Sequence, residues 1–311
     1  MTGTLSLPLS ALELQIAVRT AQRYDPARLD RVLRFERERD QLEVQASTTW
    51  ESVASRIAPP GMRDALAACP STVGECVAVN AAGPDGAPFV AHVESIALVM
   101  AEGELRRVSR QSAPKLFALA VGGQGLFGIA YSVTLRVESL LQAAREAREN
   151  AVLQLSSDRA PARALELLLP PEEAEDFLEE ARRRCAEWRV GLHGIAVRRT
   201  LPENETFLRW ARREYAAISL HVEVLRSLGG SVRTTQLRRE LIDAAIALGG
   251  SFAIACTPEA TRAQVEACYP ELKALLAEKR RIDPEDKVSS PWHRHQRSLL
   301  AREACAVRWN R

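Results

Sequence analysis

The chain has 311 residues, a length that corresponds to about two domains. Its 42 lysine and arginine residues nearly balance its 40 aspartate and glutamate residues, so the formal net charge is +2. Such a balance gives no overall attraction to nucleic acid or to an anionic membrane. Hydrophobic residues make up 46% of the chain and charged residues 26%, which excludes a disordered, collagen-like or low-complexity protein and predicts a buried core.

The sequence contains no run of about 18 apolar residues, so it predicts no transmembrane helix. Its N-terminal segment lacks a basic start followed by an uninterrupted apolar stretch, which argues against a secretory signal. The six cysteines are scattered and form no C-x-x-C pair, as is usual for reduced intracellular proteins. We therefore expect a cytoplasmic protein, and the abundance of alanine and arginine is typical of bacterial genomes of high GC content.

The first half of the chain predicts helices mixed with mostly antiparallel strands. Helical spacing of apolar residues predicts helices over 9–24, with Ser10 as N-cap, 49–57 and 114–120. Alternation of apolar and polar residues predicts strands over 41–48, 92–100, 105–109 and 129–138. The second and third of these strands flank a tight turn and predict a hairpin.

A polar, irregular stretch between residues 140 and 164 marks the predicted domain boundary. Beyond it, strands are predicted over 164–169, 189–198, 216–224 and 251–256. Helices are predicted over 171–188, 234–248 and 258–282, the last with a break before Pro270. Two helices packed on one face of an antiparallel sheet would form a ferredoxin-like α+β layer.

Two glycine-bearing segments, residues 71–83 and 121–128, are the candidate ligand sites. Glycines let backbone N–H groups approach a phosphate without obstruction by a Cβ atom. The second segment contains G-x-G-x-x-G, but the motif precedes a predicted strand instead of opening a helix, which argues against a Rossmann site. The glycines therefore have two interpretations, a ligand site or ordinary tight turns.

The order of these segments resembles the FAD-binding domain of FAD-linked oxidases of the vanillyl-alcohol oxidase/p-cresol methylhydroxylase type. It is most similar to the branch that contains alditol oxidases and decaprenylphosphoryl-ribose oxidase. The segments that carry the resemblance are residues 42–57, 71–83, 92–110, 114–137, 249–254 and 260–295. The last of them contains the motif K-R-R-I-D-P, similar to the closing signature of the family.

The resemblance implies an α+β fold in which a reduced FAD-binding domain of this type precedes a ferredoxin-like cap domain. The FAD domain would comprise residues 1–140 and a C-terminal arm, 282–311, and the cap domain residues 164–281. FAD would bind without a covalent link. By resemblance, the cofactor-binding residues are Thr72, Val73, Gly74, Asn80, Gly83, Glu94, Ser95, Gly122, Gly123, Gly125, Leu126, Gly128 and Ile129.

The sequence departs from the family pattern at the expected cofactor site. No glycine-rich pyrophosphate loop of the R-G-G-G-H-S kind separates the first helix from residues 25–40. Glu75 replaces the second glycine of the T-V-G-G turn, so a carboxylate would face an anionic pyrophosphate. Residues 82–86 lack a histidine-bearing insert, and the stretch between 140 and 164 is short.

His221 and Lys279 are the candidate catalytic residues. His221 shares a strand face with Glu223, and the pair could perform acid–base chemistry, although a histidine on a half-buried strand is commonly structural. Lys279 and Asp283 lie where the family has a basic residue near its active-site cavity, and the alternative is a solvated charge run. His293 and His295 lack a third ligand, so no metal site is predicted.

Two functions follow. The first is an FAD-dependent oxidoreductase that oxidises an alcohol group of a polyol, a sugar or a related hydroxylated small molecule. The second is a degenerate, non-catalytic family member that has lost flavin binding and acts as a partner or scaffold subunit of another enzyme. A third possibility is that a partner subunit supplies the missing loop. No nucleic-acid partner and no membrane span are expected.

Overall fold

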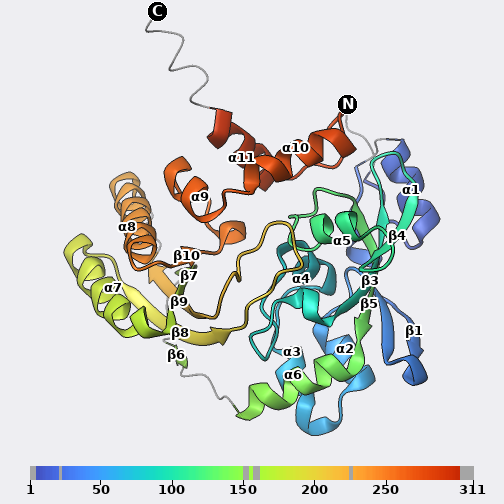
Figure 1. Cartoon of the computed structure of the whole chain (residues 1–311), viewed down its shortest axis with the longest axis horizontal. Coiled ribbons are helices and arrows are strands. Elements are labelled where there is room, and N and C mark those ends of the chain that lie inside the picture. Colours follow the sequence, from blue (N-terminus) through green and yellow to red (C-terminus); the bar gives the residue numbers. More distant parts are fainter. Residues whose placement is uncertain (1–4, 21–22, 150–153, 157–161, 224–226, 302–311) are drawn as a thin grey trace, which may run out of the picture. The chain divides into compact units, whose positions relative to one another are not determined.

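The computed structural model describes residues 5–20, 23–149, 154–156, 162–223 and 227–301. The chain forms two compact units. Unit 1 comprises Met1–Asn150, Asn204–Leu208 and Lys273–His293, and unit 2 comprises Ala151–Glu203, Arg209–Leu272 and Arg294–Arg311. Each unit contains one antiparallel sheet with helices, which confirms the predicted α+β class (Figure 1). No helix among the described residues combines the length and apolar composition that spanning a membrane requires.

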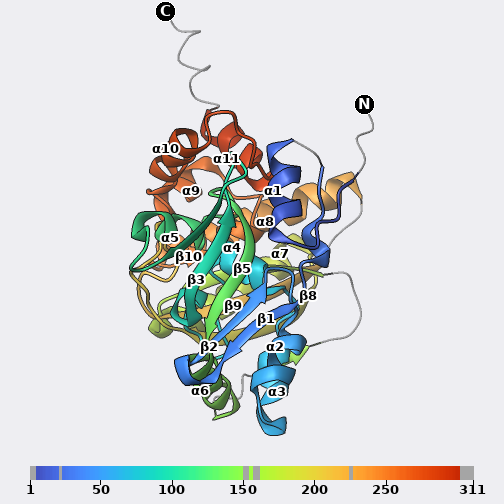
Figure 2. The same ribbon diagram turned by 90° about the vertical axis from the view of Figure 1, so that its right-hand side faces the viewer.

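The sheet of unit 1 has the strand order β1-β2-β5-β3-β4, with every neighbouring pair antiparallel (Figure 2). Its strands are β1 (Val32–Glu36), β2 (Gln41–Gln45), β3 (Val93–Val99), β4 (Leu105–Ser109) and β5 (Ile129–Arg136). Register places Val133 of β5 between Val44 and Ile96, which forms an apolar row on one face. The adjacent residue Thr134 lies beside Glu43 and Ser95 on the other, polar face.

The helices of unit 1 are α1 (Ala11–Arg19), α2 (Trp50–Ile57), α3 (Arg63–Ala67), α4 (Val73–Val79), α5 (Pro114–Ala120) and α6 (Val137–Glu149). Ser10 caps α1 as predicted, because its Oγ accepts the N–H of Glu13 at 3.3 Å. The prediction that this helix runs to residue 24 is wrong. The helix ends at Arg19, and Tyr24 forms a parallel bridge with Ser6 instead.

Unit 1 is completed by segments from later in the chain. Helix α10 (Leu272–Ile282) belongs to it from Lys273 onward, whereas the sequence analysis placed residues up to 281 in the second domain. An ion pair of 2.6 Å joins Lys115 of α5 to Glu278 of α10. Helix α11 (Pro291–Ala301) begins in unit 1 and continues in unit 2.

The sheet of unit 2 has the strand order β10-β7-β9-β8-β6 and is also antiparallel. Its strands are β6 (Gln154–Ser156), β7 (Ala162–Leu169), β8 (Leu192–Thr200), β9 (Tyr215–Glu223) and β10 (Ser251–Phe252). Its helices are α7 (Ala174–Trp188), α8 (Leu228–Ala247) and α9 (Arg262–Cys268). Helices α7 and α8 lie side by side in Figure 1, and the indole N–H of Trp188 donates to Glu240 at 2.8 Å.

Two boundaries in unit 2 differ from those predicted. Helix α8 starts at Leu228, six residues before the predicted start at 234, because Ser227 Oγ accepts the N–H of Gly230 and caps it. The strand predicted over 251–256 ends at Phe252 and is followed by a 3₁₀ turn. Short 3₁₀ helices of the chain are Pro26–Arg28, Arg37–Arg39, Pro60–Met62, Phe89–His92, Pro171–Glu173 and Ile254–Cys256.

Candidate functional site

A cavity of about 450 Å³ in unit 1 brings the two glycine-bearing segments together. We call it the glycine cavity; it lies where α4, the turn at 121–128 and residues 25–27 meet. Its apolar wall includes Leu98, Phe127 and Ile129, and its charged side chains are the carboxylates of Asp25 and Glu75. The described residues that line it include no lysine, arginine or histidine.

Some of the predicted cofactor residues line this cavity and others do not. The predicted residues that line it are Thr72, Gly74, Gly125, Gly128 and Ile129. Val73 and Leu126 are core residues, exposed by 0% and 1%. The side chain of Asn80 accepts the N–H of Val90 at 2.9 Å. At Gly83, a Cβ atom would lie 2.8 Å from the ring of His92, so this position serves close packing.

The N-terminus of α4 is closed by its own side chains. The N–H of Glu75 donates to Thr72 Oγ1 at 3.3 Å, and the N–H of Thr72 donates to Glu75 Oε2 at 2.7 Å, which forms a capping box. Glu75 therefore keeps its carboxylate at the cavity by bonding to the backbone there. It does not turn away from the helix start.

The next two amides of α4 are also occupied. The N–H of Val73 donates to Thr48 O at 3.0 Å, and that of Gly74 donates to Ala46 O at 2.7 Å. A Cβ atom at Gly74 would lie 2.8 Å from Ala46 Cβ and O, so this glycine is required by the approach of α4 to residue 46. All four amides at the start of the helix thus donate within the protein.

The wall formed by residues 25–27 offers no backbone donor either. The N–H of Asp25 donates to Ser6 O at 2.9 Å, and that of Ala27 donates to Asp25 Oδ1 at 3.0 Å. Pro26 has no N–H. The hydroxyl of Ser47, on the same side, donates to Pro26 O at 2.8 Å.

The glycine turn is held by packing and by backbone bonds to α4. The N–H of Gly122 donates to Val77 O, and the N–H of Gln124 donates to Ala78 O, each at 2.8 Å. A Cβ atom at Gly123 would lie 1.9 Å from Leu119 O, and Gly128 adopts φ 133°. Gly125, with φ 70°, has open space around its Cα. Close approach or a positive φ accounts for all four glycines, and among them Gly125 alone has open space where a Cβ atom would stand.

Glu94 and Ser95, also predicted at the cofactor, lie on the polar face of the sheet. There they line a second cavity, of about 380 Å³. Glu94 pairs with Arg136 at 2.8 Å, and Ser95 accepts a hydrogen bond from Arg107 at 3.2 Å. Burial opposes ionisation of the neighbouring Glu43, but hydrogen bonds from Ser132 and Arg107 hold its pKa below the ordinary value. These charges balance one another across the strands.

The predicted catalytic residue His221 lies exposed on β9 of unit 2. Its backbone pairs with Ala164 and Gly194. The carboxylate of Glu223, its expected acid–base partner, accepts the N–H of Gly191 at 3.1 Å. The prediction that His221 and Glu223 lie on one strand is confirmed. The carboxylate of Glu223, however, accepts a hydrogen bond from the backbone of Gly191.

Lys279 is 1% exposed and Asp283 is 4% exposed, so the alternative of a solvated charge run is wrong. Their side chains form a hydrogen-bonded ion pair. Burial raises the pKa of Asp283, but the Lys279 ammonium and the N–H groups of Val288 and Lys287 outweigh burial and lower it overall. His293 Nδ1 lies 3.3 Å from Asp286 Oδ1. Within the described ranges, no three metal-ligating side chains gather.

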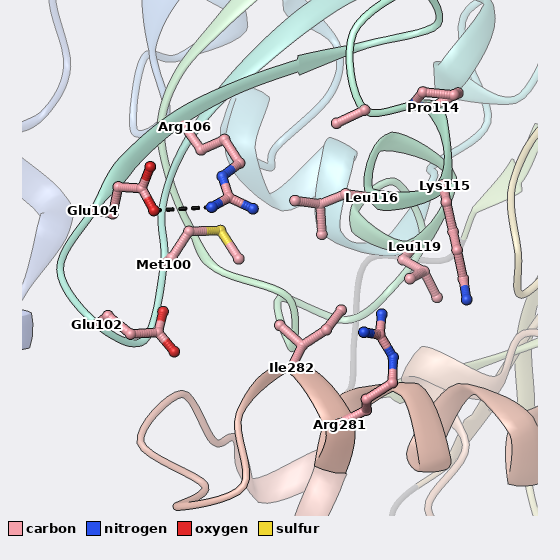
Figure 3. A pocket seen from close by; sticks show the side chains of 11 residues that line it. Met100, Glu102, Glu104, Arg106, Pro114, Lys115, Leu116, Leu119, Arg281 and Ile282 are labelled. Carbon is pink, nitrogen blue, oxygen red and sulfur yellow. Dashed lines mark hydrogen bonds and ion pairs between the residues drawn. The ribbon is translucent and has the colours of Figure 1, made fainter.

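A third cavity in unit 1, of about 620 Å³, lies between the β3–β4 hairpin, α5 and α10 (Figure 3). Its apolar residues include Met100, Leu116 and Ile282. Its cations are Arg106, Lys115 and Arg281, and each bonds to a glutamate, either Glu104 or Glu278. The cavity therefore favours neither an anionic nor a cationic ligand. Sequence reasoning missed it because it joins segments more than 150 residues apart.

Asp85, His92 and Ser139 form a second arrangement that the sequence analysis missed. Ser139 Oγ lies 2.8 Å from His92 Nδ1, and Asp85 Oδ1 lies 3.6 Å from His92 Nε2. These three residue types are those of a hydrolytic triad. His92, however, is only 1% exposed, so a substrate cannot reach it. The three side chains instead connect the segment at 85–92 to α6.

Comparison with known proteins adds no relative. Neither protein-family models nor curated proteins give a match to this chain. The resemblance to FAD-linked oxidases therefore depends on the sequence motifs alone.

Proposed function

We propose that the chain is a non-catalytic relative of the FAD-linked oxidases that does not bind flavin dinucleotide and acts as a partner or scaffold subunit. The observation that carries this proposal is that the amides at the start of α4 and at residues 25 and 27, which border the glycine cavity, already have acceptors within the protein. The amides of Thr72, Val73, Gly74 and Glu75 all donate within the protein. Those of Asp25 and Ala27 do the same. A pyrophosphate bound by backbone N–H groups needs such donors to be unoccupied.

Charge argues in the same direction. Asp25 and Glu75 bring two carboxylates to the cavity, and no cation lines it in the part of the chain that the structure describes. A carboxylate about 4 Å from a phosphate charge is repelled by roughly 1 kcal/mol in water and by about 4 kcal/mol near a protein surface. The residues present therefore do not fit the pyrophosphate of FAD, and we derive no redox step through it.

The fold supports kinship with the family independently of the cofactor. Along the chain, unit 2 follows the order β7-α7-β8-β9-α8-β10, and in space its strands lie as β10-β7-β9-β8. A βαββαβ order with this arrangement is the ferredoxin-like layer expected for a cap domain. In unit 1, the glycines at 122, 123 and 128 serve packing and turn geometry. A relative that had lost the flavin would still need them.

The second candidate function is the flavin-dependent oxidation of a hydroxylated substrate. It is favoured by one observation: five of the predicted cofactor residues meet at one cavity of about 450 Å³. A volume of this size is within the range of small-molecule sites. If flavin binds, the exposed His221 would remain a candidate for accepting the substrate proton, whereas Lys279 is buried in its ion pair with Asp283.

The decisive experiment is the visible absorbance of the freshly purified protein, followed by thermal melting with added FAD. We expect no flavin absorbance and no change in Tm at saturating FAD, because a ligand stabilises only a fold that binds it. A flavin spectrum, or a Tm that rises with FAD concentration, would overturn the proposal and favour the oxidoreductase. Riboflavin, which lacks the pyrophosphate, shows in parallel whether the phosphates cause the rejection.

The variant Glu75→Gln sharpens this test. Glutamine can keep the capping box while removing the charge. We expect no gain of FAD binding, because Val73 and Gly74 still donate to Thr48 and Ala46. Gain of binding in this variant would show that charge alone excludes the cofactor.

A further inference from the structure

Two cysteines of unit 1 lie in contact. Cys69 Sγ and Cys76 Sγ are 3.6 Å apart. Cys69 is half-buried in the loop between α3 and α4, and Cys76 is buried on α4 with 2% exposure. Cys185, Cys256 and Cys268 belong to unit 2. Scattered cysteines gave no sign of such a pair in the sequence.

The surroundings assign different roles to the two sulfurs. Cys76 Sγ accepts the indole N–H of Trp50 at 3.3 Å. The hydrogen bond with Cys69 raises the pKa of the Cys76 thiol, and burial raises it further. Because the thiolate is the reactive form, the more accessible Cys69 is the sulfur that an oxidant meets first.

The geometry permits a bond after a small movement. A disulfide has an S–S distance of about 2.05 Å, so the two sulfurs must approach by roughly 1.5 Å. Cys69 lies outside regular helix, in residues 68–71, where a change of side-chain rotamer and a slight loop shift can supply this movement. Cys76 can stay in place on α4.

We propose that Cys69 and Cys76 are a modification site at which a hydroperoxide forms a reversible disulfide. Cys69 ionises and its thiolate attacks the peroxide; the O–O bond breaks and Cys69 becomes a sulfenic acid, and the leaving oxygen takes the proton that the thiol lost and departs as an alcohol or water. The Cys76 sulfur then attacks the Cys69 sulfur. The S–S bond forms, the S–O bond breaks, and the hydroxyl leaves as water with the Cys76 proton. The thiols lose two electrons, and the peroxide gains them.

The bond would tie the loop after α3 to the helix whose start lines the glycine cavity. Residues Thr72 to Glu75, with their capping box, lie between the two cysteines. This inference does not depend on whether the chain binds flavin.

The test treats the full chain with hydrogen peroxide, unfolds it and alkylates the remaining thiols. Cys69 and Cys76 should both become unavailable to alkylation, and dithiothreitol should restore both thiols, whatever the oxidation of the exposed Cys256. Cleavage after Glu75 separates the two cysteines, so mass spectrometry should find their peptides joined. Oxidation of the exposed Cys256 shows that the peroxide has acted on the protein. If Cys69 and Cys76 are then still fully alkylated, the proposal is overturned.

Variants supply the controls. Cys69→Ser and Cys76→Ser should each abolish the link, and Cys256→Ser should leave it unchanged. If Cys76→Ser fails to fold, Cys69→Ser still tests the pair, because it leaves the buried sulfur and its contact with Trp50 intact. A crosslink between these two peptides that persists in Cys69→Ser would contradict the assignment.

Discussion

Lys279 and Asp283 show at the residue scale how an ion pair can be held inside unit 1. Each charge is almost fully buried, and burial of an ion is costly unless its partner and further hydrogen bonds compensate. Asp283 has both: besides the lysine, it accepts the N–H of Val288 at 2.8 Å and that of Lys287 at 3.0 Å. The carboxylate thus fixes the turn that follows α10.

We expect Asp283→Asn to lower the free energy of unfolding by about 3 kcal/mol, because the buried Lys279 ammonium keeps only the carboxylate of Asp286, at 3.9 Å, as counter-charge. Lys279→Met should cost less, since Asp283 keeps two backbone donors. Urea denaturation measures both. Lys287→Met is the matched control: its side chain makes only an exposed pair with Glu285, worth at most about 1 kcal/mol. Equal small effects for all three variants would contradict a buried pair.

The same variants have a distinct pH signature. The pKa of Asp283 is lowered by folding, so its contribution to stability is present above the pKa of the unfolded chain, about 3.9, and is lost as pH falls through the folded value. The stability difference between the wild type and Asp283→Asn should therefore shrink below about pH 4. A difference that stays constant down to pH 2 would show that Asp283 carries no charge-dependent role.

At the element scale, the turn at 121–128 is fixed by the close approach of its backbone to α5 and by bonds to α4. Gly123→Ala should lower the free energy of unfolding by about 3 kcal/mol or more, because its Cβ would lie 1.9 Å from Leu119 O and the backbone must move. Gly229→Ala is the control. It lies in α8 with open space around it and should raise stability by about 0.5–1 kcal/mol.

Chemical denaturation of the two glycine variants gives the comparison. Wild-type stability in Gly123→Ala would mean that the turn relaxes freely and that its glycines are retained for another reason, such as a ligand.

At the scale of the whole molecule, unit 1 is assembled from three separate stretches of chain. The N–H of Phe207 donates to Ala118 O at 2.8 Å, and Arg110 Nη2 donates to Glu205 Oε1 at 3.1 Å. Glu278 adds its ion pair to Lys115. Helix α5 thus depends on residues more than 80 positions away.

A fragment of residues 1–150 should consequently lose protection in α5. We expect its amides to exchange with solvent faster than in the full chain, because the partners at 204–208 and 273–293 are missing. Amides of β5 are the internal control, since their strand partners all lie within the fragment. Equal acceleration in α5 and β5 would indicate global destabilisation instead.

Local patterns were sufficient for most of the fold. Strands β3 and β5 follow from alternation, and the α9–α10 break follows from Pro270. Strand β1 was missed because charged residues surround its few apolar positions. Helix α4 was missed because it has only seven residues and carries Gly74 in its first turn, although Thr72 and Glu75 have the spacing of a capping box.

Local sequence patterns are sufficient for the α+β class, the order of most strands and helices, and the segments that meet at the glycine cavity. The tertiary structure is needed to show which amide donors around that cavity already have acceptors. The amides of α4 are consumed by Ala46 and Thr48, on a segment more than 20 residues away. Likewise, Lys279 and Asp283 are polar residues at helical spacing, and their burial depends on what packs over α10. Hydrogen-bond partners and burial are set by contacts between distant residues, which local patterns do not contain.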